Sequence, residues 1–352
     1  MTKAALALFL FSSALAAQSA PRGVWKFAVS GDSRNCGDLV MPAIAAGVRH
    51  DGASFYWHLG DFRAIYKFDE DLEPPPQLGL HEKALSTADY LAAAWPDFIA
   101  HQIAPFGNLP VFLAIGNHET IAPMTREAWL VQFADWLETP LIRGQRLKDH
   151  PADHKLHAYY HWIRRNIDFI TLDNATPDQF DAAQLAWLQA VLEQDESSSE
   201  IQTIVVGMHE ALPDSVASQH SMSSAPQGEK TGREAYEALW HARDAAHKQV
   251  YVLASHSHFY MENIFDSPEW KGKVLPGWII GTAGAVRYKL PPETTPAQHA
   301  QTAVYGYLIG TVTNAGAVSF AFHKLSLEDL RAATGGKYPE PLIRWCYDEN
   351  KQ

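Results

Sequence analysis

Five short apolar segments each end abruptly in a polar cluster, and this alternation restricts the possible folds more than any other feature. The segments are residues 24–30, 54–59, 110–115, 201–206 and 250–254. Each has the length of a β-strand and is rich in Val, Ile, Phe or Tyr, which favour strands. The glycine, aspartate, asparagine and histidine residues that follow are typical of turns.

Helical patterns separate these predicted strands. We expect helices over residues 86–103, 178–193 and 232–246, where apolar residues recur with helical spacing. Strands that alternate with helices predict an α/β fold. Residues 277–282, 305–312 and 317–324 read as sequential strands with short turns, which predicts a more antiparallel section that completes the sheets.

The N-terminal twenty residues have the pattern of a secretory signal peptide. Lys3 precedes an apolar stretch at residues 4–17, and small residues follow it. We therefore expect residues 1–20 to be removed, residues 21–352 to form a single domain, and the protein to be secreted or periplasmic. No cysteine lies at the expected cleavage site, and no other stretch is long and apolar enough to span a bilayer, so no stable membrane anchor is expected.

Charge and cysteine content restrict the partners. The chain carries 28 Lys and Arg against 40 Asp and Glu, a formal net charge of -12, so nucleic acid is not an expected partner. If the protein handles phosphate, the positive charge must be local, from a metal ion or a few basic side chains. Cys36 and Cys346 are the two cysteines, and the sequence leaves open whether they form a disulfide or remain free thiols.

Residues 213–231 are rich in Ser, Pro and Gly and directly follow a predicted strand end. They predict a long loop, which either covers a site as a lid or lies disordered on the surface.

Potential metal ligands follow all five predicted strands. Asp and Asn oxygens and His nitrogens suit Mn, Fe or Zn, and ligands in α/β sheets collect beyond the carboxyl ends of strands. A carboxylate such as that of Asp61 can bridge two ions, and two ions about 4 Å apart can clamp a phosphate and activate water. The candidate ligands are Asp32, Asp61, Asn117, His209, His256 and His258.

In sequence, these elements resemble the calcineurin-like metallophosphoesterase superfamily over about residues 25–325. The matching elements are Gly31-Asp32-Ser33-Arg34, Gly60-Asp61, Gly116-Asn117-His118-Glu119, Gly207-Met208-His209 and Ser255-His256-Ser257-His258. The resemblance implies a four-layer α/β/β/α sandwich with mixed sheets and an active site at the carboxyl ends of the strands.

The resemblance also implies a ligand set and a reaction. Asp32, Asp61 and His258 would hold one metal ion, and Asp61, Asn117, His209 and His256 would hold a second. His118 would protonate the leaving oxygen or stabilise the transition state. The implied reaction is hydrolysis of a small phosphomonoester or phosphodiester by a hydroxide that bridges the two ions, which would be Fe, Mn or Zn.

The chain departs from the family pattern at the first motif. Arg34 stands where the family has a histidine ligand, and an arginine cannot ligate a metal but donates hydrogen bonds suited to phosphate. We predict that Arg34 contacts the substrate, or instead that it forms a salt bridge that orients the Asp32 loop. Arg63 is a second candidate for substrate binding. Ala64 occupies the position at which purple acid phosphatases have a tyrosine, so an iron–tyrosinate centre is not expected.

Two other functions remain open from the sequence. Gly31-Asp32-Ser33 also resembles the nucleophile motif of GDSL-type serine hydrolases, with Ser33 as nucleophile and Asp244 and His247 at the required spacing. However, Asp244 and His247 lie in a helical pattern far from the C-terminus. Alternatively, replacement of the histidine by Arg34 could leave a phosphoryl-ligand binding protein with one metal ion or none. The sequence indicates neither the ester class nor the oligomeric state.

Overall fold

The computed structural model describes residues 23–65, 69–80, 85–176 and 180–352. The predicted signal peptide at residues 1–20 lies outside the described residues. Its cleavage, the location of the protein and the single-domain organisation therefore stay predictions. None of the helices within the described ranges has the length and apolar character needed to cross a bilayer.

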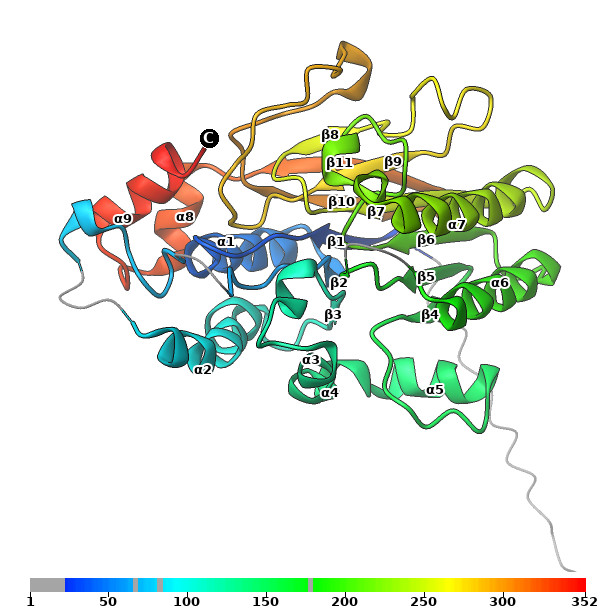
Figure 1. The fold of residues 1–352 in the computed structure, drawn as a ribbon, viewed down its shortest axis with the longest axis horizontal. Coiled ribbons are helices and arrows are strands. Elements are labelled where there is room, and N and C mark those ends of the chain that lie inside the picture. The colour runs from blue at the N-terminus through cyan, green and yellow to red at the C-terminus, as the bar shows by residue number, and fades with distance from the viewer. Residues whose placement is uncertain (1–22, 66–68, 81–84, 177–179) are drawn as a thin grey trace, which may run out of the picture.

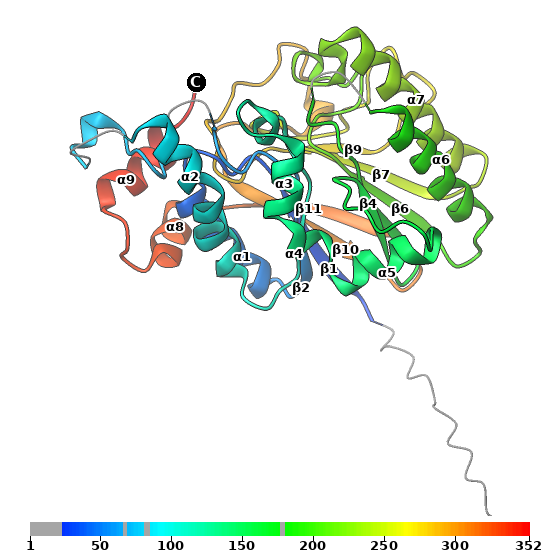
Figure 2. The ribbon, with the colours of Figure 1, turned by 60° about the horizontal axis from the view of Figure 1, so that its bottom comes forward.

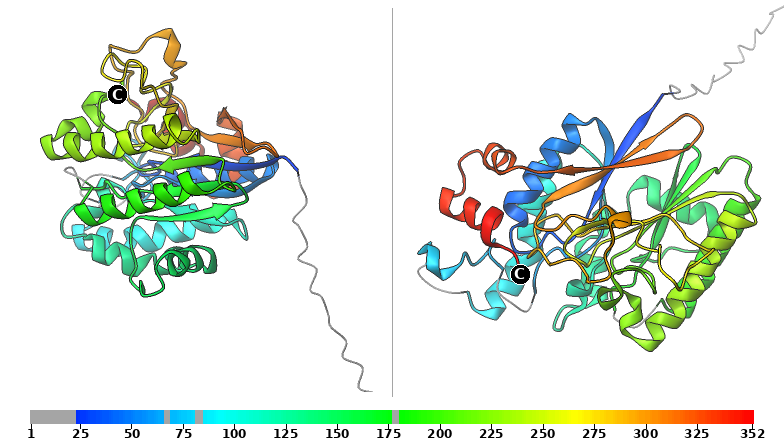
Figure 3. Two further views of the ribbon diagram at one scale, coloured as in Figure 1. Left: turned by 90° about the vertical axis from the view of Figure 1, so that its right-hand side faces the viewer. Right: turned by 90° about the horizontal axis from the view of Figure 1, so that it is seen from above.

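Sheet A has five strands in the order β11-β10-β1-β2-β3. Strands β1, β2 and β3 are parallel, and the hairpin β10–β11 adds to β1 in antiparallel orientation (Figure 3, right). The strands are β1 (Trp25–Ser30), β2 (Ala53–His58), β3 (Val111–Leu113), β10 (Gly306–Val312) and β11 (Val318–Lys324).

Sheet B has six strands in the order β4-β5-β6-β7-β9-β8. Strands β5, β6, β7 and β9 are parallel, and β4 and β8 are antiparallel edge strands. The predicted strand at residues 277–282 is thus a parallel member of sheet B, so the three C-terminal strands do not form one antiparallel section. The strands are β4 (Tyr160–Arg164), β5 (Ile167–Thr171), β6 (Thr203–Gly207), β7 (Gln249–Ala254), β8 (Tyr260–Glu262) and β9 (Gly277–Ile280).

The inner faces of the two sheets meet in an aromatic core. Because side chains alternate along a strand, Phe27 and Phe55 of sheet A both point toward sheet B. The ring centroids of Phe27 and Phe55 lie 5.1 and 5.2 Å from that of Phe169 on β5. The neighbouring residue Tyr56 points the other way, and its hydroxyl lies 3.6 Å from Met41 Sδ on helix α1 (Gly37–His50).

Helices cover the outer face of each sheet. Figure 1 shows α1 beside α8 (Leu327–Thr334) over sheet A, and Figure 2 shows α6 (Ala182–Ser197) and α7 (Pro226–Asp244) side by side along sheet B. Apolar residues of α6 and α7 share one buried cluster with the outward-facing residues of β5, β6 and β7. The predicted α/β/β/α sandwich is therefore confirmed. The remaining helices are α2 (Thr87–Phe98), α3 (Arg126–Gln132), α4 (Ala134–Leu137), α5 (Pro140–Asp149) and α9 (Glu340–Arg344).

The predicted helices form, but two begin elsewhere. Helix α6 begins at Ala182, where the Asp181 side chain accepts a hydrogen bond from Gln184 N; residues 177–179 lie outside the described part. Helix α7 begins at Pro226, so residues 226–231 are helical and do not belong to a loop. Proline suits the first turn of a helix because that turn leaves its N–H groups unpaired. The preceding residues contain two short 3₁₀ helices, Ser218–His220 and Met222–Ser224.

The structure answers the question that the two cysteines left open. Cys36 and Cys346 form a disulfide with a Cα–Cα distance of 5.9 Å. The bond fixes the C-terminal tail beside the residue that precedes α1.

A buried ionic group attaches α5 to sheet B. His161 on β4 places Nδ1 2.6 Å from Asp168 on β5 and Nε2 2.7 Å from Asp149 at the end of α5. Burial lowers the pKa of His161, but the two carboxylates raise it to a net value of about 10. Burial also raises the pKa of the nearby Asp195 to about 9. His161 and Asp195 are therefore both protonated in the folded protein near neutral pH.

We expect the free energy of unfolding to fall as the pH rises from 7 to 10. The folded-state pKa of His161, about 10, lies above its ordinary value of 6.5, so its contribution is complete below pH 6.5 and is lost as the pH approaches 10. At pH 7, His161→Ala should cost about 3–5 kcal/mol because it leaves buried carboxylates unpaired. Urea unfolding at several pH values measures both effects, with His241→Ala, whose side chain is 63% exposed, as the control. An equal free energy of unfolding at pH 7 and 10 would contradict the raised pKa of His161 in the folded protein.

Candidate metal centre

The carboxyl ends of the strands bring all six predicted ligands to one edge, between the two sheets. Asp32 follows β1, Asp61 follows β2, and Asn117 follows β3, while His209 follows β6 and His256 and His258 follow β7. Three of these residues have a left-handed backbone, with φ of 60° at Asp32, 59° at Asp61 and 63° at His256. Such a conformation costs a non-glycine residue about 1–2 kcal/mol, and conformations of this kind cluster at functional sites.

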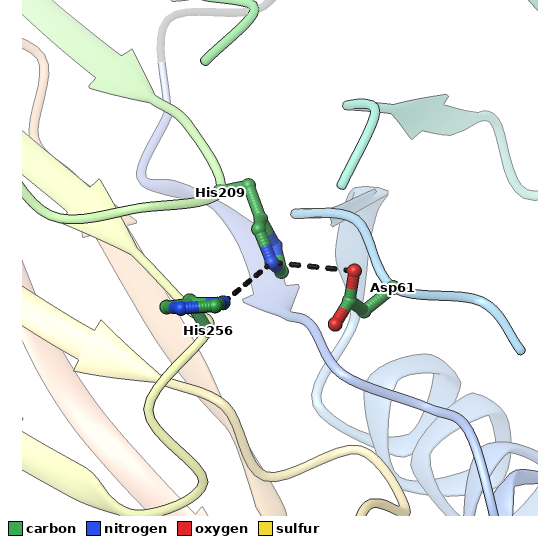
Figure 4. Close-up of side chains that lie close together, drawn as sticks. All are labelled: Asp61, His209 and His256. Atoms are coloured by element: carbon green, nitrogen blue, oxygen red, sulfur yellow. Dashed lines mark hydrogen bonds and ion pairs between the residues drawn. The ribbon is translucent and has the colours of Figure 1, made fainter. Parts of the chain in front are cut away.

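One group of ligand atoms surrounds the Nε2 atom of His209. This nitrogen lies 2.9 Å from Asn117 Oδ1, 3.0 Å from His256 Nδ1 and 3.3 Å from Asp61 Oδ1. Figure 4 shows the rings of His209 and His256 and the carboxylate of Asp61 pointing toward one another. Two imidazoles, a carboxylate and an amide oxygen are a donor set that suits Mn, Fe or Zn. We call these four residues the His209 group.

The ring of His209 is held in the orientation that a metal ligand needs. Its Nδ1 donates a hydrogen bond to Leu59 O at 2.9 Å, which leaves Nε2 to face the group. The side-chain oxygen of Asn174 accepts hydrogen bonds from the backbone N–H groups of His209 and Glu210, at 3.2 and 3.1 Å. Asn174 was not among the site residues that we predicted from the sequence. Its place directly after a strand was the one signal for a positioning role.

The second group consists of Asp32, Asp61 and His258, whose ligand atoms lie within 4.8 Å of one another. We call it the Asp32 group. Asp32 Oδ1 lies 3.3 Å from His258 Nε2, and His258 Nδ1 donates to Val286 O at 2.7 Å. Asp32 Oδ1 and Asp61 Oδ2 are buried and accept no hydrogen bond from any described residue. Buried carboxylate oxygens in this state fit a positively charged partner, either a metal ion or a guanidinium.

The charges at the site are strongly coupled. Burial raises the pKa of Asp61, but His118, His209 and Arg34 lower it to a net value well below its usual range. Burial lowers the pKa of His209, yet Asp61 raises it to about 10. Asp61 and His209 are thus an ion pair when no cation is bound, and an incoming metal ion has to displace a proton from His209.

Glu119 fixes Asp61 relative to the loop after β3. Its carboxylate accepts backbone hydrogen bonds from Asp61 at 2.9 Å, Phe62 at 2.8 Å and Gly116 at 2.8 Å. The two loops approach so closely that a Cβ at Gly116 would lie 2.3 Å from Asp61 N, and Gly60 has φ of +94°. Glu119 therefore positions the two loops relative to each other.

Arg34 lies directly over the Asp32 group. Its Nη2 is 3.3 Å from His258 Nε2, and its Nε is 3.8 Å from Asp61 Oδ2. The salt bridge to the Asp61 carboxylate is the alternative we set beside substrate contact. Because the side chain is 14% exposed, both roles are compatible with its position.

His118 lies at the rim of the site, and one of its ring nitrogens is occupied by a backbone hydrogen bond. Its Nδ1 donates to Ala64 O at 2.6 Å, and its Nε2 lies 3.7 Å from Asp61 Oδ2. Burial lowers the pKa of His118 to about 4. The neutral ring therefore carries its proton at Nδ1, and Nε2 faces Asp61 without one.

The substrate-binding prediction for Arg63 is wrong. Its guanidinium is fully buried and forms ion pairs with Asp38 and Asp71 at 2.8 Å, with Asp69 at 3.7 Å, and with Asp97. Asp38 belongs to α1 and Asp97 to α2, whereas Asp69 and Asp71 come from the segment that follows Arg63. Burial, together with the neighbouring carboxylates Asp38 and Asp69, raises the pKa of Asp71 well above its usual range. Arg63 is a structural cation and cannot reach a substrate.

The structure does not favour Ser33 as a nucleophile. Ser33 is fully buried, and its hydroxyl lies 2.9 Å from His58 Nε2. His58 Nδ1 accepts the backbone N–H of Gly60, and burial lowers the pKa of His58 to about 3, so the neutral ring carries its proton at Nε2. A ring in that state donates to Ser33 and cannot remove its proton. Asp244 and His247 precede β7, so they lie at the amino ends of the strands of sheet B, whereas Ser33 lies at the carboxyl ends.

We expect Glu119→Gln to weaken both the fold and metal binding. The amide offers one acceptor oxygen in place of two, so at least one backbone N–H loses its partner, at a cost of about 1–3 kcal/mol. The displaced Asp61 should lower the affinity for Mn²⁺ about 10- to 100-fold. Urea unfolding and calorimetric titration measure these effects, with Glu328→Gln, 77% exposed, as the control. Wild-type values for both quantities would exclude the positioning role.

Arg63→Met should lower the free energy of unfolding by about 3–5 kcal/mol, because it leaves buried carboxylates without their cation. The same change at Arg344, whose side chain is 56% exposed, should have little effect. Chemical unfolding of both variants gives the comparison. If Arg63→Met were as stable as the wild type and raised only the KM for a phosphoester, the structural assignment would fail.

Comparison with known proteins gives structural neighbours. The sequence matches no family profile and no curated protein sequence. The structure of PhoD aligns with a TM-score of 0.50 and 15% identity over 87% of this chain and 72% of PhoD. A dimetal phosphatase from Danio rerio aligns with a TM-score of 0.50 and 13% identity over 86% of this chain and all of that protein. GAP50, the anchor in the inner membrane complex of Plasmodium, aligns with a TM-score of 0.48 and 11% identity over 86% and 85% of the two chains.

PhoD and the dimetal phosphatase align with most of this chain, whose layered arrangement the strand order and the helix positions establish independently. Metallophosphatases are among the structural neighbours, and two groups of His and carboxylate ligands lie at the same strand edge of this chain. The chain therefore has the calcineurin-like metallophosphoesterase fold.

Proposed function

We propose that this protein is a metal-dependent phosphoesterase that acts on small phosphoesters. The observation that carries the proposal is the convergence of Asp61, Asn117 and His256 on His209 Nε2, at 2.9–3.3 Å. Two imidazoles, an amide oxygen and a carboxylate directed at one point are a donor set that suits Mn, Fe or Zn. The phosphatases among its structural neighbours support the proposal at the level of the fold.

The His209 group would hold one divalent or trivalent ion of Fe, Mn or Zn. The ion would supply a Lewis acid that activates water and neutralises phosphoryl charge. The protein contributes the orientation of the ligands. Leu59 O fixes His209, and Asp32 Oδ2 accepts the backbone N–H of His256 at 2.7 Å, which fixes the turn that carries this second imidazole.

His118 is the proposed proton donor to the leaving oxygen. Because Nδ1 is committed to Ala64 O, only Nε2 can exchange a proton with a substrate. Its pKa of about 4 makes the ring neutral in the free protein. A phosphoester brings negative charge next to Nε2, which raises the pKa of His118 and favours the doubly protonated ring.

A cavity lies beside two of the candidate metal ligands, His256 and His258. This cavity of 310 Å³ is lined by His220 and Tyr288, among others. The ring of His220 lies 5.7 Å from that of His256, and the ring of Tyr288 stacks on His258 at 4.0 Å. His220 comes from the segment that we predicted as a lid or a disordered loop. A cavity of this size fits a small phosphoester.

The disulfide bears on where the protein acts. Disulfides persist in oxidising compartments, so the Cys36–Cys346 bond supports our proposal that the chain is exported. The net charge of -12 supports a small-molecule substrate in preference to nucleic acid.

The proposed roles of His209 as a metal ligand and of His118 as a proton donor predict different effects of their substitution on metal content and turnover. His209→Ala should remove the bound metal and the turnover together, whereas His118→Ala should keep the metal and lower turnover about 10²- to 10⁴-fold. Elemental mass spectrometry and hydrolysis of p-nitrophenyl phosphate and bis-p-nitrophenyl phosphate, before and after EDTA, measure both. His241→Ala serves as the exposed histidine control.

The alternatives give other results. Turnover that survives EDTA and is lost in Ser33→Ala would indicate a serine esterase. Absence of turnover on either ester, with one metal ion or none, would indicate a binding protein. Full activity of His118→Ala would exclude its role as the proton donor.

A further inference from the structure

Arg34 places a fixed positive charge among the ligand atoms of the Asp32 group. The guanidinium lies 3.3 Å from His258 Nε2 and 3.8 Å from Asp61 Oδ2, measured from Nη2 and Nε respectively. A further hydrogen bond joins the Arg34 side chain to the hydroxyl of Tyr288. Three residues from three different loops therefore hold the guanidinium over this group.

The guanidinium and a metal ion would need the same acceptors. The Asp32 group offers its ligand atoms within 4.8 Å of one another, and Arg34 already contacts two of its three members. An arginine remains protonated and has no lone pair to share with a metal. A divalent ion placed there would meet a like charge a few ångströms away in a poorly solvated site, where repulsion is strong.

The His209 group has no such competitor among the described residues. The charged side chains that contact His209 Nε2 or Asn117 Oδ1 are the other potential ligands. The two groups share Asp61, with Oδ1 on the side of His209 and Oδ2 on the side of Arg34. The structure is thus asymmetric, with one group open to an ion and the other occupied by an arginine.

We infer that the Arg34 guanidinium takes the place of a metal ion in the Asp32 group, so that the protein binds one ion, in the His209 group. This inference rests on the proposed function and deepens it. Arg34 supplies the second positive charge and directs N–H donors at the phosphoryl oxygens, a geometry in which arginine binds two oxygens at once. It stabilises charge on the substrate and does not activate water.

Metal counting tests the inference without reference to activity. Equilibrium dialysis against Mn²⁺ followed by elemental analysis should give about one ion per chain for the wild type and about two for Arg34→His, in which an imidazole becomes a ligand. Arg34→Lys keeps the charge and should stay at about one ion. Electron paramagnetic resonance provides a second readout, since two close Mn²⁺ ions in Arg34→His should show exchange coupling that the wild type lacks.

Two histidine variants keep the test valid if Arg34→His does not fold. His256 and His258 lie two residues apart on the same loop, but only His256 belongs to the His209 group. His256→Ala should therefore abolish Mn²⁺ binding, whereas His258→Ala should keep the wild-type count. Circular dichroism and urea unfolding confirm that each variant is folded.

The outcomes separate this inference from the proposed function. Two ions of similar affinity in the wild type, with phosphoester turnover, would overturn the role of Arg34 and leave the enzyme assignment intact. Loss of one of two ions in His258→Ala would have the same meaning. A wild type that binds no ion and has no turnover would overturn both.

Discussion

The buried carboxylate of Asp61 is the interaction on which the rest of the site depends. Its Oδ1 accepts the backbone N–H of His118 at 3.0 Å and lies 3.3 Å from His209 Nε2. Its own backbone N–H binds Glu119, and its carbonyl accepts the N–H of Ser33 at 3.0 Å. One residue therefore connects the loops after β1, β2 and β3 in sheet A to the loop after β6 in sheet B. A buried charge of this kind is costly unless it is paired, and the pairing comes from His209 and Arg34.

The strand ends could be predicted because their signal is local. A buried parallel strand is an apolar run, and the residue that follows it has to turn, so Asp32, Asp61 and His209 were identifiable from their immediate neighbours in the sequence. The alternation of strands and helices predicted the layers for the same reason. The predicted start of α7 was less accurate. One Ser-rich stretch contains both the turns that precede α7 and the first turn of the helix itself.

Contacts that form only when the chain folds could not be predicted from neighbouring residues in the sequence. Arg63 follows Asp61 by two residues and resembled a phosphate ligand, but its partners Asp38, Asp69, Asp71 and Asp97 converge on it only in the folded chain. The disulfide partner of Cys36 is 310 residues away. The role of Asn174 depends on the backbone of His209, which follows another strand, β6.

The central claim is that the His209 group is a metal centre. The most direct measurement is a crystal structure of the mature protein grown with Zn²⁺, with anomalous diffraction data collected on both sides of the zinc absorption edge. Our account predicts one strong anomalous peak about 2.0–2.1 Å from His209 Nε2 and His256 Nδ1, with Arg34 still in contact with Asp61 and His258. A map without a peak at this position, in crystals that bind zinc elsewhere, would contradict the claim.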